Sequence, residues 1–399
     1  MIRKARAEDS LILYGLLFLS CLNIGEMGSL IFILFCVFAL FKLRFLIPID
    51  KNNYLLATCL CLICTVLSFF TWGINDAIKC LNYLGAYVVG YSLFVYAEDK
   101  QKIIRYSLFS VFCGFALQII MVYFYNLYRG QPSTRTMYAI WNDGLISVTL
   151  IALLSSIVIG YSFYAIVINK NKILKYFAIG ALLITALINI TTATRTPFLL
   201  FGIVFFILFL FQTRNGDRSA KIKILLSVVL FALFACAAYY FDWFGVRTFL
   251  LNSALFDRFG EEGLQTGRIR IAKRFISCMP KYPFGGGLAR KEIHNYAHNI
   301  LLEIYDMYGI VPFLIISVFY IQGIKNIFKV FKYGNDSDCN YLFVGLYIAI
   351  LIQMFLEPVI EGFPILFYVF LFMHGMCKAY IKFGLIGELV HEDSGDKYL

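Results

Sequence analysis

Charged residues are scarce in this chain of 399 residues. Asp, Glu, Lys and Arg together make up 15% of it, whereas hydrophobic residues make up 61%. Soluble globular proteins have about 25% charged and about 45–50% apolar residues. The composition therefore excludes a cytosolic enzyme, a disordered chain and a secreted disulfide scaffold, and it predicts an integral membrane protein.

Other features are missing as well. The sequence has no internal repeat, which argues against a transporter built from duplicated halves. It has no low-complexity linker, so we expect one membrane domain with one soluble insertion. The 11 cysteines form no disulfide framework, because most of them fall inside apolar runs, where Cys acts as a small hydrophobic residue. We expect neither a metal ion nor another cofactor.

Twelve apolar runs are candidate membrane spans; crossing a bilayer takes about 20 mostly apolar residues. They lie at residues 10–26, 28–43, 53–72, 78–97, 103–127, 143–168, 174–193, 197–212, 222–241, 299–320, 341–357 and 362–381. The expected fold is an all-α polytopic membrane protein with about 12 transmembrane helices and one large outer loop that contains short helices. Residues 1–241 hold the first nine helices, residues 242–298 the loop, and residues 299–399 the last three helices and a tail.

The positions of the cations predict the orientation. If the N-terminus is cytoplasmic, 22 of the 35 Lys and Arg residues fall on the predicted cytoplasmic segments, with at least three on each. Cytoplasmic loops of membrane proteins collect Lys and Arg. We therefore expect both termini in the cytoplasm, and the net charge of +11 needs no nucleic acid to explain it.

The predicted outer loop, residues 242–298, carries nine of the remaining cations against five acids. Two interpretations stay open for it: a solvated surface, or an extracytoplasmic site for an anion. Another cation, Arg195, lies between two apolar runs and just before the helix breaker Pro197. An arginine at membrane depth costs about 2.5–3.5 kcal/mol on insertion scales and usually faces a cavity or a partner. The alternative is an arginine that reaches the membrane interface.

A short amphipathic helix is expected at residues 266–280, with Thr266 as its cap and Pro280 as its stop. One face of this helix is apolar. The other face carries the cations Arg270, Lys273 and Arg274. Such a helix suits the interface between bilayer and water. Arg268 falls in its first turn, where free N–H groups and the helix dipole favour an anion; the alternative is an ordinary surface arginine.

Glycines and histidines follow this helix. The three glycines at 285–287 allow the backbone to approach a ligand closely, but the Lys–Ser/Thr ending of a Walker phosphate loop is missing. His294 and His298, four residues apart, could share a helical face and hold zinc. A zinc protease would need a Glu directly after the first His, which this chain lacks. Glu303 and Asp306 come next and indicate a polar site near the outer end of a span; the alternative is that either is simply exposed to water.

Several of these motifs resemble the O-antigen ligase/polymerase family. His298-Asn299, followed after nine residues by Gly309, is similar to the signature of that family. The other similar elements are Thr194-Arg195 before a span, the Thr266-Gly267-Arg268 helix, the run Pro283-Phe284-Gly285-Gly286-Gly287, and Arg135 followed by Trp141-Asn142-Asp143.

The resemblance implies an enzyme of the bacterial inner membrane that acts on the periplasmic face, so the outer loop would be periplasmic. Such enzymes take a glycan from undecaprenyl diphosphate and transfer it to a sugar hydroxyl. The acceptor is another lipid-linked repeat unit in a polymerase, or lipid A-core in a ligase. The implied partners are thus the lipid-linked glycan donor, a glycan or lipid A-core acceptor, the lipid bilayer and a chain-length regulator protein, with no cofactor and no nucleic acid.

The residue types fit this chemistry. Guanidinium groups pair bidentately with phosphate oxygens, so we expect Arg135, Arg195 and Arg268 to hold the diphosphate. The acceptor hydroxyl needs a base within hydrogen-bond reach, and we expect His298 in this role, with Glu303 in reserve. Residues expected to support the site are Arg270, Arg274, His294 and Asn299.

A polymerase is the favoured activity, because the acidic Glu303 soon after His298 is more similar to polymerases. The alternative is an O-antigen ligase. A flippase for lipid-linked oligosaccharides ranks lower, since it would need cations along its spans rather than in a loop. Only Arg195 and Lys79 meet that requirement.

Overall fold

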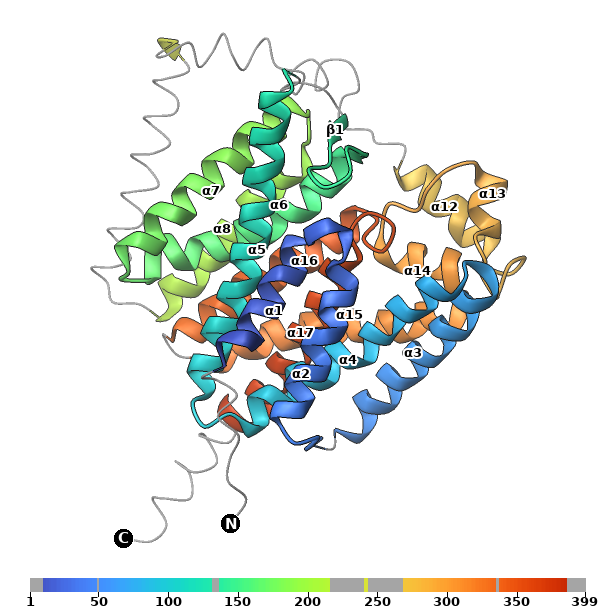
Figure 1. The fold of residues 1–399 in the computed structure, drawn as a ribbon, viewed down its shortest axis with the longest axis horizontal. Helices are drawn as coiled ribbons and strands as arrows, with labels where there is room; N and C mark the ends of the chain where they lie inside the picture. The colour runs from blue at the N-terminus through green and yellow to red at the C-terminus, as the bar shows by residue number, and fades with distance from the viewer. Residues whose placement is uncertain are drawn as a thin grey trace, which may run out of the picture.

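The computed structural model describes residues 10–48, 50–130, 136–215, 240–242, 268–334 and 337–385. Over these residues the chain is a bundle of helices with one small antiparallel hairpin (Figure 1). Of the residues singled out from the sequence, Arg135, Thr266 and Gly267 lie outside the described ranges, as do most of the predicted span 222–241 and the first part of the predicted outer loop.

Within the described ranges, nine helices are long and apolar enough to cross a membrane. They are α3 (Lys51–Thr71), α4 (Ile74–Tyr96), α5 (Lys100–Tyr128), α6 (Val148–Phe163, continued by η3, Tyr164–Ile168), α7 (Lys172–Thr191), α8 (Thr196–Asn215), α15 (Ile310–Tyr333), α16 (Asp338–Leu356) and α17 (Pro364–Tyr380, continued by η5, Ile381–Leu385). Two shorter apolar helices come first, α1 (Leu11–Leu22) and α2 (Gly28–Lys42), with the single turn η2 (Ile24–Glu26) between them. The helices agree with an all-α polytopic membrane protein, as the composition predicts.

Side-chain caps fix where several of these helices begin. Asp99 Oδ1 accepts a hydrogen bond from the Lys102 N–H at 2.9 Å at the start of α5. Asn171 Oδ1 accepts one from the Ile173 N–H at 2.9 Å at the start of α7. Asp and Asn are favoured at this position because they bind N–H groups that have no partner inside the helix. The apolar runs thus determine where the helices lie in the sequence, and the short polar side chains determine the residue at which these helices begin.

The predicted span 299–320 is wrong as a single helix. The chain breaks at Gly309, whose φ of +87° is in the left-handed region, into α14 (Ile300–Tyr308) and α15. A Cβ atom on Gly309 would meet the Pro283 carbonyl oxygen at 2.4 Å. The close approach of two backbones therefore requires glycine here, and the membrane-crossing helix begins only at Ile310.

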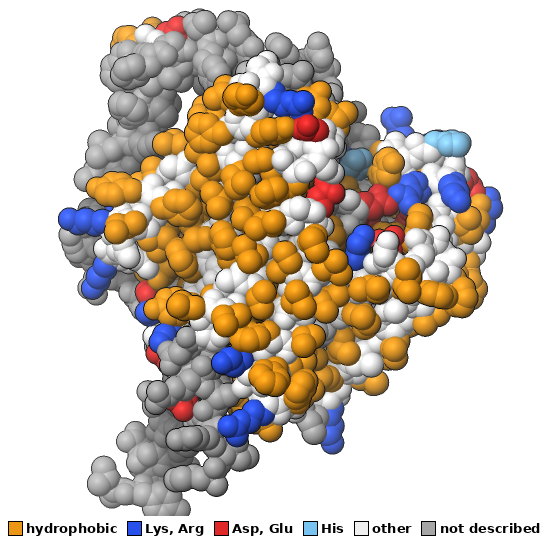
Figure 2. Space-filling model, viewed as in Figure 1, with side chains coloured by type: hydrophobic (Ala, Val, Ile, Leu, Met, Phe, Trp, Pro, Cys, Tyr) orange, Lys and Arg blue, Asp and Glu red, His pale blue; other side chains and the backbone are white. Residues whose placement is uncertain are grey.

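The helices α6, α16 and α17 form the centre of the bundle, because most of their residues are buried, whereas only about a third or fewer of the residues of α3, α7, α8 and α15 are buried. Apolar side chains cover the surface of the bundle in the space-filling view (Figure 2). In a soluble protein such a surface would be an aggregation hazard. In a bilayer it is the surface that lipid covers.

Glycines allow the central helices to approach closely. A Cβ atom on Gly90 of α4 would lie 2.0 Å from the Phe372 carbonyl oxygen of α17, and one on Gly375 of α17 would lie 2.3 Å from the Tyr87 carbonyl oxygen. Small residues at such contacts let helix backbones pack in membranes, where van der Waals contact drives helix association.

Three short helices form a module beside the bundle: α12 (Arg268–Cys278), α13 (Leu288–Ile293) and α14. We call them the α12–α14 module. They share a small core of their own, made of Phe275, Cys278, Ala289, Ile293, Ala297, Leu302 and Tyr305. The module thus includes α14, beyond the predicted loop boundary at residue 298.

The described residues also contain a two-stranded antiparallel hairpin in addition to the helices. Strand β1 (Thr136–Tyr138) pairs with β2 (Leu145–Ser147), with Met137 opposite Ile146. Asn126 of α5 binds the backbone of Tyr138 twice, with Nδ2 donating to the carbonyl at 3.0 Å and Oδ1 accepting from the N–H at 2.8 Å. The hairpin is therefore fixed to the end of α5.

The glycine contact between α4 and α17 predicts a stability effect. Gly90→Ala should lower the free energy of unfolding by about 1–3 kcal/mol, because the added methyl group overpacks a backbone contact. The measurement is thermal melting of the purified protein in detergent. Gly202→Ala on α8 is the matched control, since nothing lies within 4 Å of its Cβ position, and it should leave the melting temperature equal or higher. Equal melting temperatures for Gly90→Ala and the control would contradict the close packing.

Candidate functional site

Acidic side chains gather on the short loop that joins α16 to α17, residues 357–363, which we call the acidic loop. It carries Glu357 and Glu361. In the space-filling view, acidic and basic side chains meet where the bundle faces the α12–α14 module (Figure 2). Residues from four separate parts of the chain bind this loop, and two of them, Arg268 and Glu303, are residues that the sequence singled out.

Arg268, the first residue of α12, binds the start of the acidic loop. Its Nη2 donates to Glu357 Oε1 at 2.8 Å, and its Nη1 donates to the Leu356 carbonyl at 2.8 Å. That carbonyl is at the C-terminal end of α16, where backbone oxygens have no partner inside the helix. Glu357 is buried, and a third of the Arg268 side chain is exposed. Arg268 therefore holds the acidic loop while part of its side chain stays exposed.

The junction between α7 and α8 meets the same carboxylate. Thr196, the first residue of α8, donates from Oγ1 to Glu357 Oε1 at 3.3 Å. The chain turns sharply before it, with Ala193 in the left-handed region at φ +56°. Arg195 is half-buried and lies directly before the first residue of α8, and its carbonyl oxygen accepts a hydrogen bond from the Phe198 N–H at 3.2 Å. Arg195 thus lies one residue from the Glu357 contact.

His298 lies close enough to Arg268 for the charge of the guanidinium group to affect it. Burial and that positive charge both lower the pKa of His298 below its usual value. Its Nδ1 atom is buried and has no hydrogen-bond partner among the described residues. A buried polar atom without a partner is unusual and costly in a folded protein. A neutral imidazole in this position has the proton-accepting capacity that a base needs.

Glu303 of α14 is buried and binds the backbone of the acidic loop. Its Oε2 accepts from the Val359 N–H at 2.6 Å and its Oε1 from the Glu361 N–H at 2.6 Å. Burial raises the pKa of Glu303 to about 8, although the backbone hydrogen bonds oppose this shift. Both carboxyl oxygens are therefore occupied by the loop, which favours a positioning function over direct contact with an acceptor.

Arg290 of α13 binds the far end of the acidic loop. Its Nη1 contacts Glu361 Oε1, and its Nε lies 3.5 Å from Asp306 Oδ2. Burial raises the pKa of both carboxyl groups, and the charge of Arg290 opposes that shift. The guanidinium carbon lies 5.7 Å from the Trp72 ring and 5.3 Å from the Tyr296 ring, within cation–π range. Arg290 therefore ties the module to the loop and to the turn between α3 and α4.

The glycine run packs against protein backbone rather than standing open for a ligand. Gly285, Gly286 and Gly287 all have φ near +70°. A Cβ atom on Gly285 would meet the Gly309 nitrogen at 2.5 Å. The Gly287 N–H donates to the Asp306 carbonyl at 2.8 Å. The run therefore wraps the end of α14, which explains both its glycines and Gly309.

Some residues predicted to support the site have local structural functions. Asn299 caps α14, because its Oδ1 accepts from the Leu302 N–H at 3.0 Å. His294 is exposed and ends α13 in a left-handed conformation, with φ +56°. The prediction that His294 and His298 could share a helical face is wrong, since the chain between them is not helical. Within the described residues, no three side chains of His, Cys, Asp or Glu lie together as metal ligands would.

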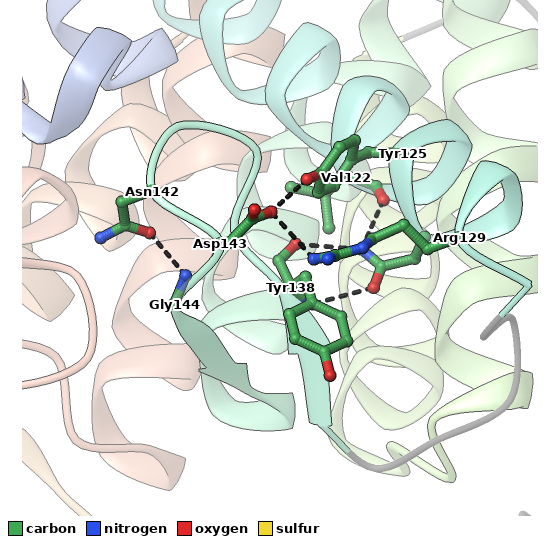
Figure 3. A network of polar contacts seen from close by, with 8 residues as sticks. Val122, Tyr125, Arg129, Tyr138, Asn142, Asp143 and Gly144 are labelled. Carbon is green, nitrogen blue, oxygen red and sulfur yellow. Dashed lines mark hydrogen bonds and ion pairs between the residues drawn. The ribbon is translucent and has the colours of Figure 1, made fainter.

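The remaining predicted residues lie at the edge of the site or beyond the described ranges. Arg270 and Arg274 are exposed on α12. Arg135 is not described, but the hairpin loop that follows it is. There, Asp143 Oδ1 binds Arg129 Nη1 at 2.8 Å and accepts a hydrogen bond from the Tyr125 hydroxyl (Figure 3). This network lies at the same end of the bundle, as described below.

Sequence reasoning missed Glu357, Glu361, Arg290 and Thr196. Glu357 was assigned to the end of the predicted span 341–357, whereas α16 stops one residue earlier. Acidic residues at membrane depth are costly and are usually functional, so two glutamates between adjacent apolar runs were the available signal. Nothing local in the sequence indicates that Arg268 reaches a carboxylate 89 residues away.

Part of the chain is similar to a known protein family. Residues 179–317 match the family model described as O-antigen ligase. No match to the chain is found among curated proteins. The matched region covers less than half of the chain, but it runs from α7 to α15 and includes Arg195, Arg268 and His298. The match supports the O-antigen ligase/polymerase family, which the motifs of this chain resemble.

Proposed function

We propose that this protein is a glycosyltransferase of surface polysaccharide synthesis, which transfers a glycan from undecaprenyl diphosphate to a sugar hydroxyl. The observation that carries the proposal is the meeting of three separate parts of the chain: Arg268, the Arg195–Thr196 junction and His298. All three lie around one carboxylate, Glu357, or close to the arginine that binds it. A cationic site beside a neutral histidine suits a diphosphate leaving group and an acceptor hydroxyl.

Arginine side chains hold the leaving group in this mechanism. The guanidinium group of Arg268 can pair with phosphate oxygens in the bidentate way that it pairs with carboxylates. Glu357 binds Nη2 of that group, so the diphosphate competes with Glu357 for it. Arg195 lies beside Thr196 and adds a second cation. Charge that develops on the leaving phosphate is then stabilised where it forms.

His298 acts as the base in the proposed step. The acceptor oxygen attacks the anomeric carbon of the donor sugar and gives its proton to the imidazole. The bond from that carbon to the phosphate oxygen breaks, and the electron pair leaves with undecaprenyl diphosphate. Direct displacement of this kind inverts the anomeric carbon. General base catalysis contributes about 10²–10⁴-fold to such steps.

A polymerase is the activity we favour, with an O-antigen ligase as the alternative that shares the same chemistry. The clustering of Arg268, His298 and the acidic loop supports an enzyme over a flippase, whose cations would line its spans. The acceptor is then a lipid-linked repeat unit, or lipid A-core for a ligase. A chain-length regulator is an expected protein partner of a polymerase.

The site faces the periplasm in this proposal, and the protein lies in the inner membrane with both termini in the cytoplasm. Residues 242–298, together with α14, then form the periplasmic part between the two sets of membrane helices. The lipid carrier reaches the site from the outer leaflet, because the site lies where membrane helices α7, α8 and α16 end or begin.

Deletion of the gene followed by complementation tests this function. The deletion strain should show a single repeat unit on lipid A-core if the polymerase is lost. It should show no polymer on core, with lipid-linked polymer accumulating, if a ligase is lost. Wild-type protein and Lys273→Ala should restore the normal gel pattern, because Lys273 is exposed on the same helix as Arg268. Arg268→Lys should fail, since an ammonium group cannot form the bidentate pair. An unchanged pattern in the deletion strain would contradict the proposal.

The histidine predicts the pH dependence. The base must be neutral, and the pKa of His298 lies below its usual value of about 6.5. The loss of activity that comes from protonation of His298 should therefore appear only when the pH drops through that lowered pKa. The measurement is kcat/KM against pH for the purified protein. If the residual activity of His298→Gln kept the same fall at low pH, the base would be another group.

A further inference from the structure

We propose that the hairpin loop of residues 138–143 is a binding site for a sugar residue of the glycan. This inference rests on the proposed function, because it names where the sugar chain lies. Two features carry it: a half-exposed ion pair between Arg129 and Asp143 that is stacked on aromatic rings, and a loop that is fixed before any ligand binds.

The ion pair has unused hydrogen-bonding capacity. Arg129 Nη1 lies 2.8 Å from Asp143 Oδ1, which also accepts from the Tyr125 hydroxyl (Figure 3). Both hydrogen bonds of Asp143 to these residues go to the same oxygen, Oδ1. More than half of the Asp143 side chain and a third of the Arg129 side chain are exposed. Guanidinium has five N–H donors, so fixed donors and an acceptor remain available side by side.

Aromatic rings lie next to these polar groups. The guanidinium carbon of Arg129 lies 4.3 Å from the Tyr138 ring and 5.6 Å from the Tyr125 ring. Trp141, in the same loop as Asp143, is exposed. A sugar residue has an apolar C–H face and a rim of hydroxyl groups. A site with an aromatic face beside fixed donors and acceptors matches both.

The charges of this ion pair favour a sugar over an anionic ligand such as a diphosphate or a lipid phosphate. The Arg129 and Asp143 charges cancel, so this pair has no net attraction for a diphosphate or a lipid phosphate. A hydroxyl group, in contrast, can donate to the carboxylate and accept from the guanidinium. The chemistry therefore favours an uncharged, hydroxyl-rich ligand.

The loop is held rigid from several sides. Asn142 Nδ2 donates to Glu26 Oε1 at 2.6 Å, which fixes the loop to the turn before α2. Asn142 Oδ1 accepts from the Gly144 N–H at 2.8 Å (Figure 3). Asp143 has a φ of +57°, a left-handed conformation that Asp tolerates. A fixed binding surface loses little conformational freedom when a ligand arrives, which favours affinity.

The hairpin borders the acidic loop. Strand β2 ends at Ser147, and α6 begins at the next residue. A Cβ atom on Gly362 of the acidic loop would lie 3.0 Å from Leu153 and 3.7 Å from Thr149, both in the first turns of α6. The hairpin therefore leads directly into the start of α6, and the acidic loop packs against the same part of α6. A glycan whose diphosphate is bound by Arg268 can reach the hairpin loop.

The test uses oligosaccharide released by mild acid from the surface polysaccharide of the organism that encodes the chain. Saturation-transfer NMR measures its binding to the full-length protein in nanodiscs. Asp143→Asn and Trp141→Ala should weaken binding at least tenfold, whereas Trp141→Phe keeps the aromatic face and should bind within a few-fold of wild type. Asp76→Asn is the matched control, because the Asp76–Lys79 pair is similarly exposed, and it should bind as wild type.

Transfer kinetics of the same variants separate the two sources of the sugar. A higher KM for the acceptor alone identifies the acceptor glycan, and a higher KM for the lipid-linked donor alone identifies the donor glycan. Wild-type affinity in Asp143→Asn and Trp141→Ala, or no binding to wild-type protein, would overturn the sugar site while leaving the transferase function intact. Binding that needs Asp143 in a protein without transferase activity would contradict the proposed function instead.

Discussion

The contact between Arg268 and Glu357 joins the α12–α14 module to the helix bundle. A membrane bundle has to keep acidic side chains out of lipid or give them partners. Here the acidic loop receives a partner at each point: Arg268 at its start, the Glu303 carboxyl group under its backbone, and Arg290 at its end. The α12–α14 module supplies all three, so the position of the module and the position of the loop depend on each other.

This mutual dependence has a chemical consequence. A buried ion pair is costly to break by removing one partner and is easier to exchange for another partner of the same charge. A lipid-linked sugar diphosphate carries two negative charges, so it can compete with Glu357 for Arg268, and the Thr196 hydroxyl stays as a hydrogen-bond donor to Glu357. The burial and the nearby positive charge that lower the pKa of His298 also keep its imidazole neutral, as a base requires.

Much of the fold could be predicted from apolar runs alone, because a span needs about 20 apolar residues and few charges. The break at Gly309 could not, since it depends on the backbone of Pro283, which is distant in sequence. For the site, Arg195, Arg268 and His298 stood out as polar residues at the ends of apolar runs or in a motif. Glu357, Glu361 and Arg290 did not, because their importance comes from contacts between segments far apart in sequence. Glu303 was noticed, but its binding to loop backbone was not predictable from its residue type.

The most direct test of the central claim is an electron cryo-microscopy structure of the protein with undecaprenyl-diphosphate-linked glycan bound. The account predicts phosphate oxygens within hydrogen-bond distance of the Arg268 guanidinium group, with the Glu357 carboxylate displaced from it. It also predicts the anomeric carbon of the bound sugar on the side of His298. A diphosphate bound elsewhere, with the Arg268–Glu357 contact unchanged, would contradict the account.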